Sequence, residues 1–211
     1  ISFPYRIIHN GLHDSEFAPI RTENPEYDFV FVGEFRELKG IYSILEAARI
    51  LKREHSFAIL MVGSGPDEAA LRRRIVEYRL TKEITISPPI HPARAAFAKG
   101  QCVLAPSIRE SMPYIVLEAL AARCPLLTTA VGGIPEIFGT RRDLLLNAGD
   151  SAMLSKRMQE MLMNPVAGIQ AAEELRKHAS NHIRVTQMER DIFDFYKTFD
   201  RVRRMPKKEE A

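Results

Sequence analysis

The sequence has no tryptophan and only two cysteines, Cys102 and Cys124, among its 211 residues. This pair makes neither a disulfide framework nor a zinc-binding spacing, and each cysteine stands in an apolar stretch. We therefore expect buried thiols in a reducing compartment, which indicates a cytoplasmic protein. The six histidines form no HExxH or related pattern, so no metal site is predicted.

Long hydrophobic runs are also missing. No apolar stretch approaches the ~20 residues that a membrane-spanning helix needs. The nearest stretch, Tyr114 to Leu127, is interrupted by Glu118 and Arg123. Polar side chains stand where a signal peptide has its apolar core, and the first residue is Ile1 rather than Met. We expect the chain to be one part of a longer protein.

The net charge is concentrated at one end of the chain. The 30 Lys and Arg residues exceed the 27 Asp and Glu residues by three, and residues 201–211 alone carry this net +3. The rest of the chain is neutral, so we predict no nucleic-acid binding. The tail is expected to be a solvated end, and peripheral contact with a membrane surface, at the inner membrane face, is the alternative.

Short apolar runs rich in β-branched residues alternate with helical patterns along most of the chain. This alternation is typical of a parallel sheet covered by helices on both faces, so we predict a Rossmann-like α/β fold. In such sheets ligands bind beyond the carboxyl ends of the strands, and the loops at that edge are therefore the ones to search. The expected strands are Phe29–Val32, Phe57–Val62, Ile84–Ile86, Cys102–Ala105, Leu126–Thr128 and Leu144–Leu146.

Helical periodicity places apolar side chains on one face of the segment Ile41 to Leu51. The region after residue 150 is also expected to be helical. One helix there begins at Asp150 or Ser151 and ends at Asn164, before a proline. A last helix carries a long apolar stripe from Val185 to Phe199.

The first candidate loop, Gly33 to Gly40, places Lys39 at the start of a predicted helix. The helix dipole disfavours a cation there by about 0.3–1 kcal/mol, and a bound phosphate would reverse that penalty. A solvated surface lysine is the alternative.

The second candidate loop, Gly63 to Pro66, contains a glycine pair that would let backbone approach a ligand closely. The dinucleotide fingerprint would need a third glycine at position 68, where Glu68 stands. A plain tight turn explains Gly65 equally well.

The third loop leads into the most informative helix. Met112 precedes a proline and is pushed out of the helical region, and Pro113 suits the first helical position. The free N–H groups of Tyr114 and Ile115 would then form an anion site. Glu110 lies just before this helix.

Glu118 lies about 7.5 Å inside the same helix and is the only charge between Ile115 and Ala122. An unpaired carboxylate in an apolar helix needs donors, and ligand hydroxyls would each supply about 1.5–3 kcal/mol. The alternative is a buried glutamate tied to backbone or to Arg109.

These loops together describe a sugar joined through a diphosphate to a ribose. Amides, Arg36 and Lys39 would take the phosphates, while Glu110 and Glu118 would take hydroxyls on either side. A fourth loop, Val131 to Glu136, offers another glycine pair, although a bare turn is the somewhat better explanation.

In order and spacing, these segments resemble the C-terminal, donor-binding domain of glycosyltransferase family 4, the retaining group with the two-domain GT-B fold. Any one segment is a weak signal, but five in order are highly specific. The matching segments are Ile8–Pro19 with the family's "PNG…F.P", Val32–Gly40 with "vG…KG", Val62–Pro66 with "vG.GP", Pro106–Ala119 with the Glu-x7-Glu motif, and Thr129–Glu136 with "t.vGGiPE".

The resemblance implies roles for these residues. Glu110 and Lys39 would be catalytic, with Glu110 on the sugar hydroxyls and Lys39 on the diphosphate, while Glu118 would bind the ribose. The nucleobase of the donor is expected to lie near Pro88 to His91. In the mechanism usually proposed for the family, the leaving phosphate helps deprotonate the acceptor, so no protein nucleophile is needed. The remaining implied nucleotide-binding residues are Arg36, Gly65, Ser107, Met112, Pro113, Tyr114 and Ile115.

Three positions depart from the family pattern. Glu34 stands where many members have an arginine, and we propose that Arg36 replaces it. Arg123 stands where a glycine commonly ends the motif helix, and Pro113 replaces a frequent glycine.

The resemblance also implies how the chain is organised. We expect an entering arm over residues 1–20, a nucleotide-sugar-binding domain over 21–180, a helix over 181–200 that packs toward a missing N-terminal acceptor domain, and a basic tail over 201–211. The expected function is transfer of a hexose-type sugar from a UDP-, GDP- or ADP-linked donor in polysaccharide biosynthesis. No further cofactor is expected, and the fragment should be inactive alone. A same-fold epimerase and a non-catalytic nucleotide-binding module are the alternatives.

Overall fold

The computed structural model describes residues 5–20, 24–180 and 182–203, with side chains as far as residue 198. Its centre is a five-stranded parallel sheet in the order β3-β2-β1-β4-β5. The strands are β1 (Tyr27–Val32), β2 (Ile59–Val62), β3 (Ile84–Ser87), β4 (Gly100–Ala105) and β5 (Leu126–Thr128).

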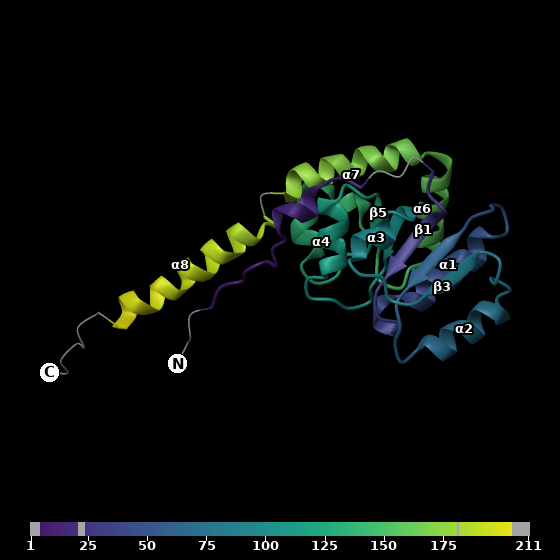
Figure 1. Ribbon diagram of the computed structural model, residues 1–211, viewed down its shortest axis with the longest axis horizontal. Coiled ribbons are helices and arrows are strands. Elements are labelled where there is room, and N and C mark those ends of the chain that lie inside the picture. The colour runs from purple at the N-terminus through teal and green to yellow at the C-terminus, as the bar shows by residue number, and fades with distance from the viewer. Residues whose placement is uncertain (1–4, 21–23, 181, 204–211) are drawn as a thin grey trace.

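The helices connect and cover these strands (Figure 1). The α-helices are α1 (Ile41–Leu51), α2 (Glu68–Glu77), α3 (Ala93–Phe97), α4 (Tyr114–Ala121), α5 (Ile134–Phe138), α6 (Ser151–Met163), α7 (Pro165–Ala179) and α8 (Val185–Arg203). The described residues also form short 3-10 helices, namely η1 (Asp14–Phe17), η2 (Glu37–Lys39) and η3 (Gly139–Leu144).

Alternation along β1 explains why both faces of the sheet are covered. Phe29 and Phe31 point into a cluster with residues of α1, α2 and α6, whereas Val30 packs with residues of α3 and α4. Successive side chains of a strand point to opposite faces, so a strand that is apolar throughout needs a helix layer on each side. The predicted Rossmann-like fold is confirmed.

The predicted sixth strand, Leu144–Leu146, is wrong. Leu144 ends η3, and Leu146 forms only an isolated parallel bridge with Thr129. Beyond Thr129 the chain turns toward the third loop, where the Gly133 amide donates to the carbonyl of Ser111 (2.7 Å). The extended segment that follows β5 is therefore too short for Leu146 to pair with it beyond this bridge. β2 also begins two residues later than predicted, at Ile59.

Helix α4 begins one residue later than the sequence suggests. Pro113 has φ −74° and ψ 124°, so it is the extended residue before the helix rather than its first helical residue. At the other end, Arg123 has φ +60°, a left-handed conformation that usually requires glycine. The helix therefore ends as a glycine would end it, with an arginine in the strained position.

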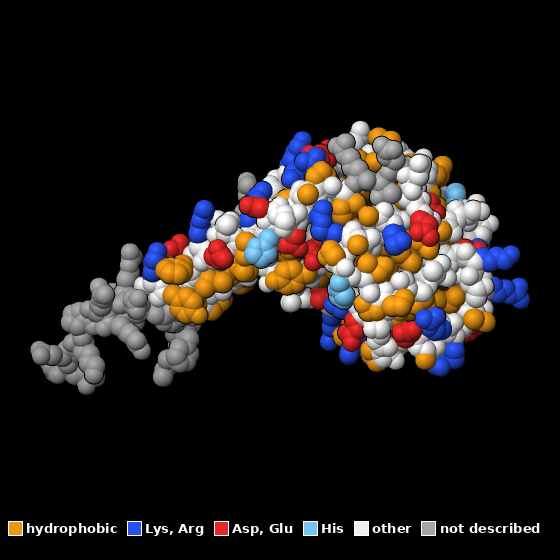
Figure 2. All heavy atoms as spheres, viewed as in Figure 1, with side chains coloured by type: hydrophobic (Ala, Val, Ile, Leu, Met, Phe, Trp, Pro, Cys, Tyr) orange, Lys and Arg blue, Asp and Glu red, His pale blue; other side chains and the backbone are white. Residues whose placement is uncertain are grey.

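The last helix leaves the body of the domain beside the entering chain (Figure 1). Of the apolar stripe predicted on it, Tyr196 is 67% exposed, whereas Val185, Met188, Ile192 and Phe195 are partly buried. Figure 2 shows hydrophobic side chains along the projecting arm. The side chain of Phe199 and the predicted basic tail, apart from the helical backbone of residues 201–203, lie outside the described residues. Within the described residues, no helix is long and apolar enough to cross a membrane.

Candidate functional site

Loops from both halves of the sheet meet at its carboxyl edge. The amide of Phe35 donates to the carbonyl of Ser64 (2.9 Å), and that of Ile108 donates to the carbonyl of Leu38 (2.8 Å). The third and fourth loops are joined by the bond from Gly133 to Ser111 (2.7 Å). The four candidate loops therefore form one continuous hydrogen-bonded surface.

Glycines in these loops allow one loop to rest on another. Gly40 has φ +76°, and a Cβ atom on it would overlap the carbonyl of Pro106. Gly132 has φ +54°, and its Cβ would overlap the carbonyls of Glu110 and Ser111. At Gly65 a Cβ would overlap the backbone of Phe35. Close approach of neighbouring backbone accounts for these glycines, without a ligand.

Lys39 and Glu110 form an ion pair between the first and third loops. The Lys39 side chain is 32% exposed and that of Glu110 is 15% exposed, so the pair is partly withdrawn from water. Lys39 ends η2, and Gly40 separates it from α1, so it does not itself begin the helix as predicted. The sequence suggested separate ligands for these residues, and the structure pairs them with each other.

Arg36 lies at the exposed rim of the site and is held by Glu34. Its Nε and Nη2 atoms donate to the two carboxylate oxygens at 3.0 and 2.9 Å. The hydrogen bond from Arg36 lowers the pKa of Glu34 and raises the pKa of Arg36 in turn. Glu34 stands where many family members have an arginine. It thus pairs with Arg36, which we expected to replace that arginine.

Glu118 is half-buried, and its Oε2 atom has no hydrogen-bond partner. Burial raises the pKa of Glu118, the carboxylate of Glu16 raises it further, and Arg94 lowers it. The guanidinium of Arg94 donates instead to the carbonyls of Glu16 and Ala18, both at 2.6 Å. Among the described residues, no ion pair joins Glu118 to Arg109.

The amino end of α4 has no side-chain cap. Val116 donates to the carbonyl of Pro113 (3.1 Å), while the amides of Tyr114 and Ile115 have no backbone partner among the described residues. Ser107 is buried, and its carbonyl accepts a hydrogen bond from the Thr129 hydroxyl (2.6 Å). Ser107 therefore packs under the third loop and is not exposed at its surface. An anion could bind at the two free amides.

Two residues of the entering segment were not predicted to reach the site. Asn10 donates through Nδ2 to the carbonyl of Met112 (3.2 Å), and His9 Nε2 lies 2.7 Å from Glu136 Oε2. The match of this segment to "PNG" was the signal that could have pointed to these two residues. The segment has no periodicity, so the sequence does not indicate which loops it contacts.

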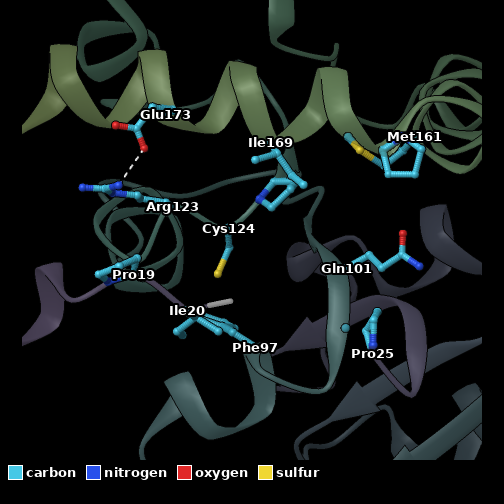
Figure 3. A pocket seen from close by; sticks show the side chains of 13 residues that line it. Pro19, Ile20, Pro25, Phe97, Gln101, Arg123, Cys124, Met161, Ile169 and Glu173 are labelled. Atoms are coloured by element: carbon cyan, nitrogen blue, oxygen red, sulfur yellow. Dashed lines mark ion pairs between the residues drawn. The ribbon is translucent and has the colours of Figure 1, made fainter. Parts of the chain in front are cut away.

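A pocket of about 720 Å³ lies at the opposite, amino edge of the sheet, beside Gly100 and Pro125 (Figure 3). Arg123 and Glu173 form an ion pair of 3.1 Å on its wall. Burial raises the pKa of Cys124, which also lines it, to about 12, so this thiol stays protonated at neutral pH. None of the predicted site residues lines this pocket. In the described part of the chain, no group of three or more His, Cys, Asp or Glu residues could hold a metal ion.

Burial of the Glu118 charge predicts a pH-dependent cost to the fold. The folded chain holds the carboxyl proton to a higher pH than the unfolded chain does, so ionisation destabilises the fold above the raised pKa. Glu118→Gln is expected to raise the free energy of unfolding at pH 7 by up to about 1 kcal/mol, because the group is only half-buried. This gain should disappear as the pH falls through the pKa of Glu118. Urea unfolding at pH 7 and pH 4, with the exposed Glu77→Gln as control, would measure it, and a gain independent of pH would contradict it.

Comparison with known proteins assigns the family. The model of the family "glycosyl transferases group 1" matches residues 26–164. The chain belongs to this family. The matched range contains the whole parallel sheet and the four candidate loops of this group 1 glycosyltransferase chain.

Curated relatives are similar over part of their length. The chain is 32% identical over 127 residues to TuaC of Bacillus subtilis, a glycosyltransferase named for teichuronic acid biosynthesis, covering 60% of this chain and 31% of that protein. It is 28% identical over 163 residues to the D-inositol 3-phosphate glycosyltransferase of Pseudarthrobacter chlorophenolicus, covering 74% of this chain and 39% of that protein. The group 1 chain thus spans less than two fifths of either relative.

Solved structures share the fold. The C-terminal domain of the group 1 family protein LpcC from Francisella tularensis superposes with a TM-score of 0.71 at 19% identity, covering 83% of this chain and all of that domain. Anabaena HepE in complex with UDP-glucose gives a TM-score of 0.79 at 15% identity, covering 92% of this chain and 57% of HepE. The predicted fold of a C-terminal glycosyltransferase half is confirmed by these matches.

Proposed function

We propose that this chain is the donor-binding half of a retaining family 4 glycosyltransferase that transfers a hexose-type sugar from a nucleoside diphosphate. The observation that carries the proposal is Glu118, a half-buried carboxylate whose Oε2 has no partner, on the helix whose first amides are free. A diphosphate fits the amides, and ribose hydroxyls supply the donors that Glu118 lacks. HepE, whose structure holds UDP-glucose, supports a UDP-linked donor among the candidates.

The Lys39–Glu110 pair suggests how the donor is received. A diphosphate attracts Lys39, and Glu110 is then released toward the sugar hydroxyls. In the transfer step, the bond between the anomeric carbon and the phosphate oxygen breaks, and a bond to the acceptor oxygen forms on the same face of the sugar. The acceptor proton passes to the leaving phosphate. Lys39, Arg36 and the amides of residues 114 and 115 stabilise the charge that develops on that phosphate.

The remainder of the enzyme is also part of the proposal. The arm over residues 1–20 and the helix over 181–200 would join the domain over 21–180 to an N-terminal acceptor domain, without which the chain transfers nothing. The names of relatives such as TuaC support an acceptor in polysaccharide biosynthesis. The two buried thiols favour the cytoplasm as the compartment.

Titration calorimetry with UDP, GDP and ADP tests the proposal. Glu118→Ala is expected to weaken binding of the preferred nucleotide by about tenfold, because a charge-assisted bond to the ribose is lost. Glu110→Ala should not weaken it, because these ligands lack the transferred sugar that Glu110 would bind. The exposed Glu77→Ala is the control. Equal losses at both site glutamates would refute the assignment, and no heat at millimolar nucleotide from a folded chain would instead favour a non-catalytic module.

A further inference from the structure

The entering segment is fastened to the start of α8. The Leu12 amide donates to the carbonyl of Ile183 (2.7 Å), and the Val185 amide donates to the carbonyl of Leu12 (2.9 Å). Gly11 lies so close to Val185 that a Cβ atom on it would touch the Val185 backbone at 2.5 Å. Farther along, Arg6 forms an ion pair with Asp191 (2.6 Å). The two chain segments that leave the domain therefore run together as one arm (Figure 1).

The same segment also contacts two loops of the proposed donor site. The Asn10 amide group holds the carbonyl of Met112, and His9 pairs with Glu136. Met112 lies between Glu110 and the free amides at the start of α4. The bond from Gly133 to Ser111 joins these two loops to each other. Residues 9 and 10 thus lie between the arm and the loops that would hold the donor.

We propose that Asn10 and His9 are positioning residues that set the geometry of the donor loop according to the position of the arm. The nucleotide ligand in this inference rests on the proposed function. The effect of Asn10 and His9 on the loops of the free chain does not depend on it. Met112 is held out of the helix by the following proline, so its carbonyl has no helical partner and Asn10 supplies the donor. A shift of the arm moves Asn10, and the Met112–Pro113 turn that orients the phosphate-binding amides moves with it. Binding at the loop and ordering of the arm are then coupled in both directions.

Hydrogen–deuterium exchange on the free chain tests the structural part. Asn10→Asp keeps the shape of the side chain and replaces the N–H donor by an oxygen facing the Met112 carbonyl. We expect exchange within residues 110–117 and 130–138 to rise at least fivefold, with exchange in β1 and β4 and the melting temperature unchanged. Asn10→Gln should restore most of the protection. The matched control is Asp14→Asn, which removes an ion pair with Arg184 at the arm but contacts neither loop.

Nucleotide binding tests the coupling. The preferred ligand among UDP, GDP and ADP is expected to slow exchange of the amides at residues 8–12 in the wild-type chain, but not in Asn10→Asp, whose affinity should fall three- to tenfold. Unchanged loop exchange in Asn10→Asp, or exchange that rises throughout the domain with a lower melting temperature, would overturn the inference. If the wild-type chain binds no nucleotide, the proposed function fails, and the exchange of the free chain still decides the positioning role.

Discussion

Replacing Lys39 by alanine is expected to weaken binding of nucleoside diphosphates about thirtyfold while leaving the affinity for the corresponding nucleosides unchanged. A charge-assisted bond from an ammonium group to a phosphate contributes about 1.5–3 kcal/mol. Part of that energy is offset, because Lys39 must leave Glu110, its partner in the free chain. The nucleoside lacks the phosphates and so does not sense the change. Calorimetric titration of each nucleotide and nucleoside pair measures both affinities.

The control for this substitution is Lys82→Ala, which removes an exposed lysine that lies outside the four candidate loops. Ionic strength provides a second control, since an interaction of Lys39 with a diphosphate weakens as salt is added. A uniform loss of affinity for nucleotide and nucleoside would mean that Lys39 supports the loop through Glu110 and does not bind phosphate.

Gly40→Ala is expected to lower the free energy of unfolding by about 3 kcal/mol or more. Two costs combine there: a left-handed φ of +76°, and overlap of the new Cβ with the backbone carbonyl of Pro106. Gly149 is a matched control, with φ +78° and no atom of another residue within 4 Å of the position that a Cβ would take. Gly149→Ala should therefore cost only the conformational part, about 1 kcal/mol.

Urea unfolding of the two variants under the same conditions separates these costs, because both begin from nearly the same φ. The difference between them measures the contact between the first and third loops. If both variants lost the same free energy of unfolding, the backbone at Pro106 would have moved at little cost to admit the new Cβ. The first and third loops would then not hold each other in place.

Local patterns were sufficient for most of the fold. Five of the six expected strands form, because apolar β-branched runs can be satisfied only between two helix layers. The face of α1 is buried as its periodicity predicts, and Asp150 accepts from the Met153 amide at the start of α6. Leu144–Leu146 failed because its extended partner ends after one residue pair, which no local pattern reveals.

The site was predictable as a set of loops and not as a set of contacts. The alternation of strands and helices places the four loops at one edge of the sheet whatever their side chains do. For the glycine pair of the fourth loop a bare turn is the better sequence-based explanation, and Gly132 does accommodate backbone, the carbonyls of Glu110 and Ser111. The sequence marks where backbone must come close, and it does not say to what.

From the order of its residues alone, this protein is committed to a parallel α/β sheet, to candidate loops at the carboxyl ends of its strands, and to a lone glutamate inside an apolar helix. Which side chains meet there depended on folding. Lys39 and Glu110 are 71 residues apart, and Asn10 reaches Met112 across 102 residues. Strands and helices follow from interactions between near neighbours in the chain, whereas these partners are set by how separate loops pack against one another, and that packing is a property of the assembled domain.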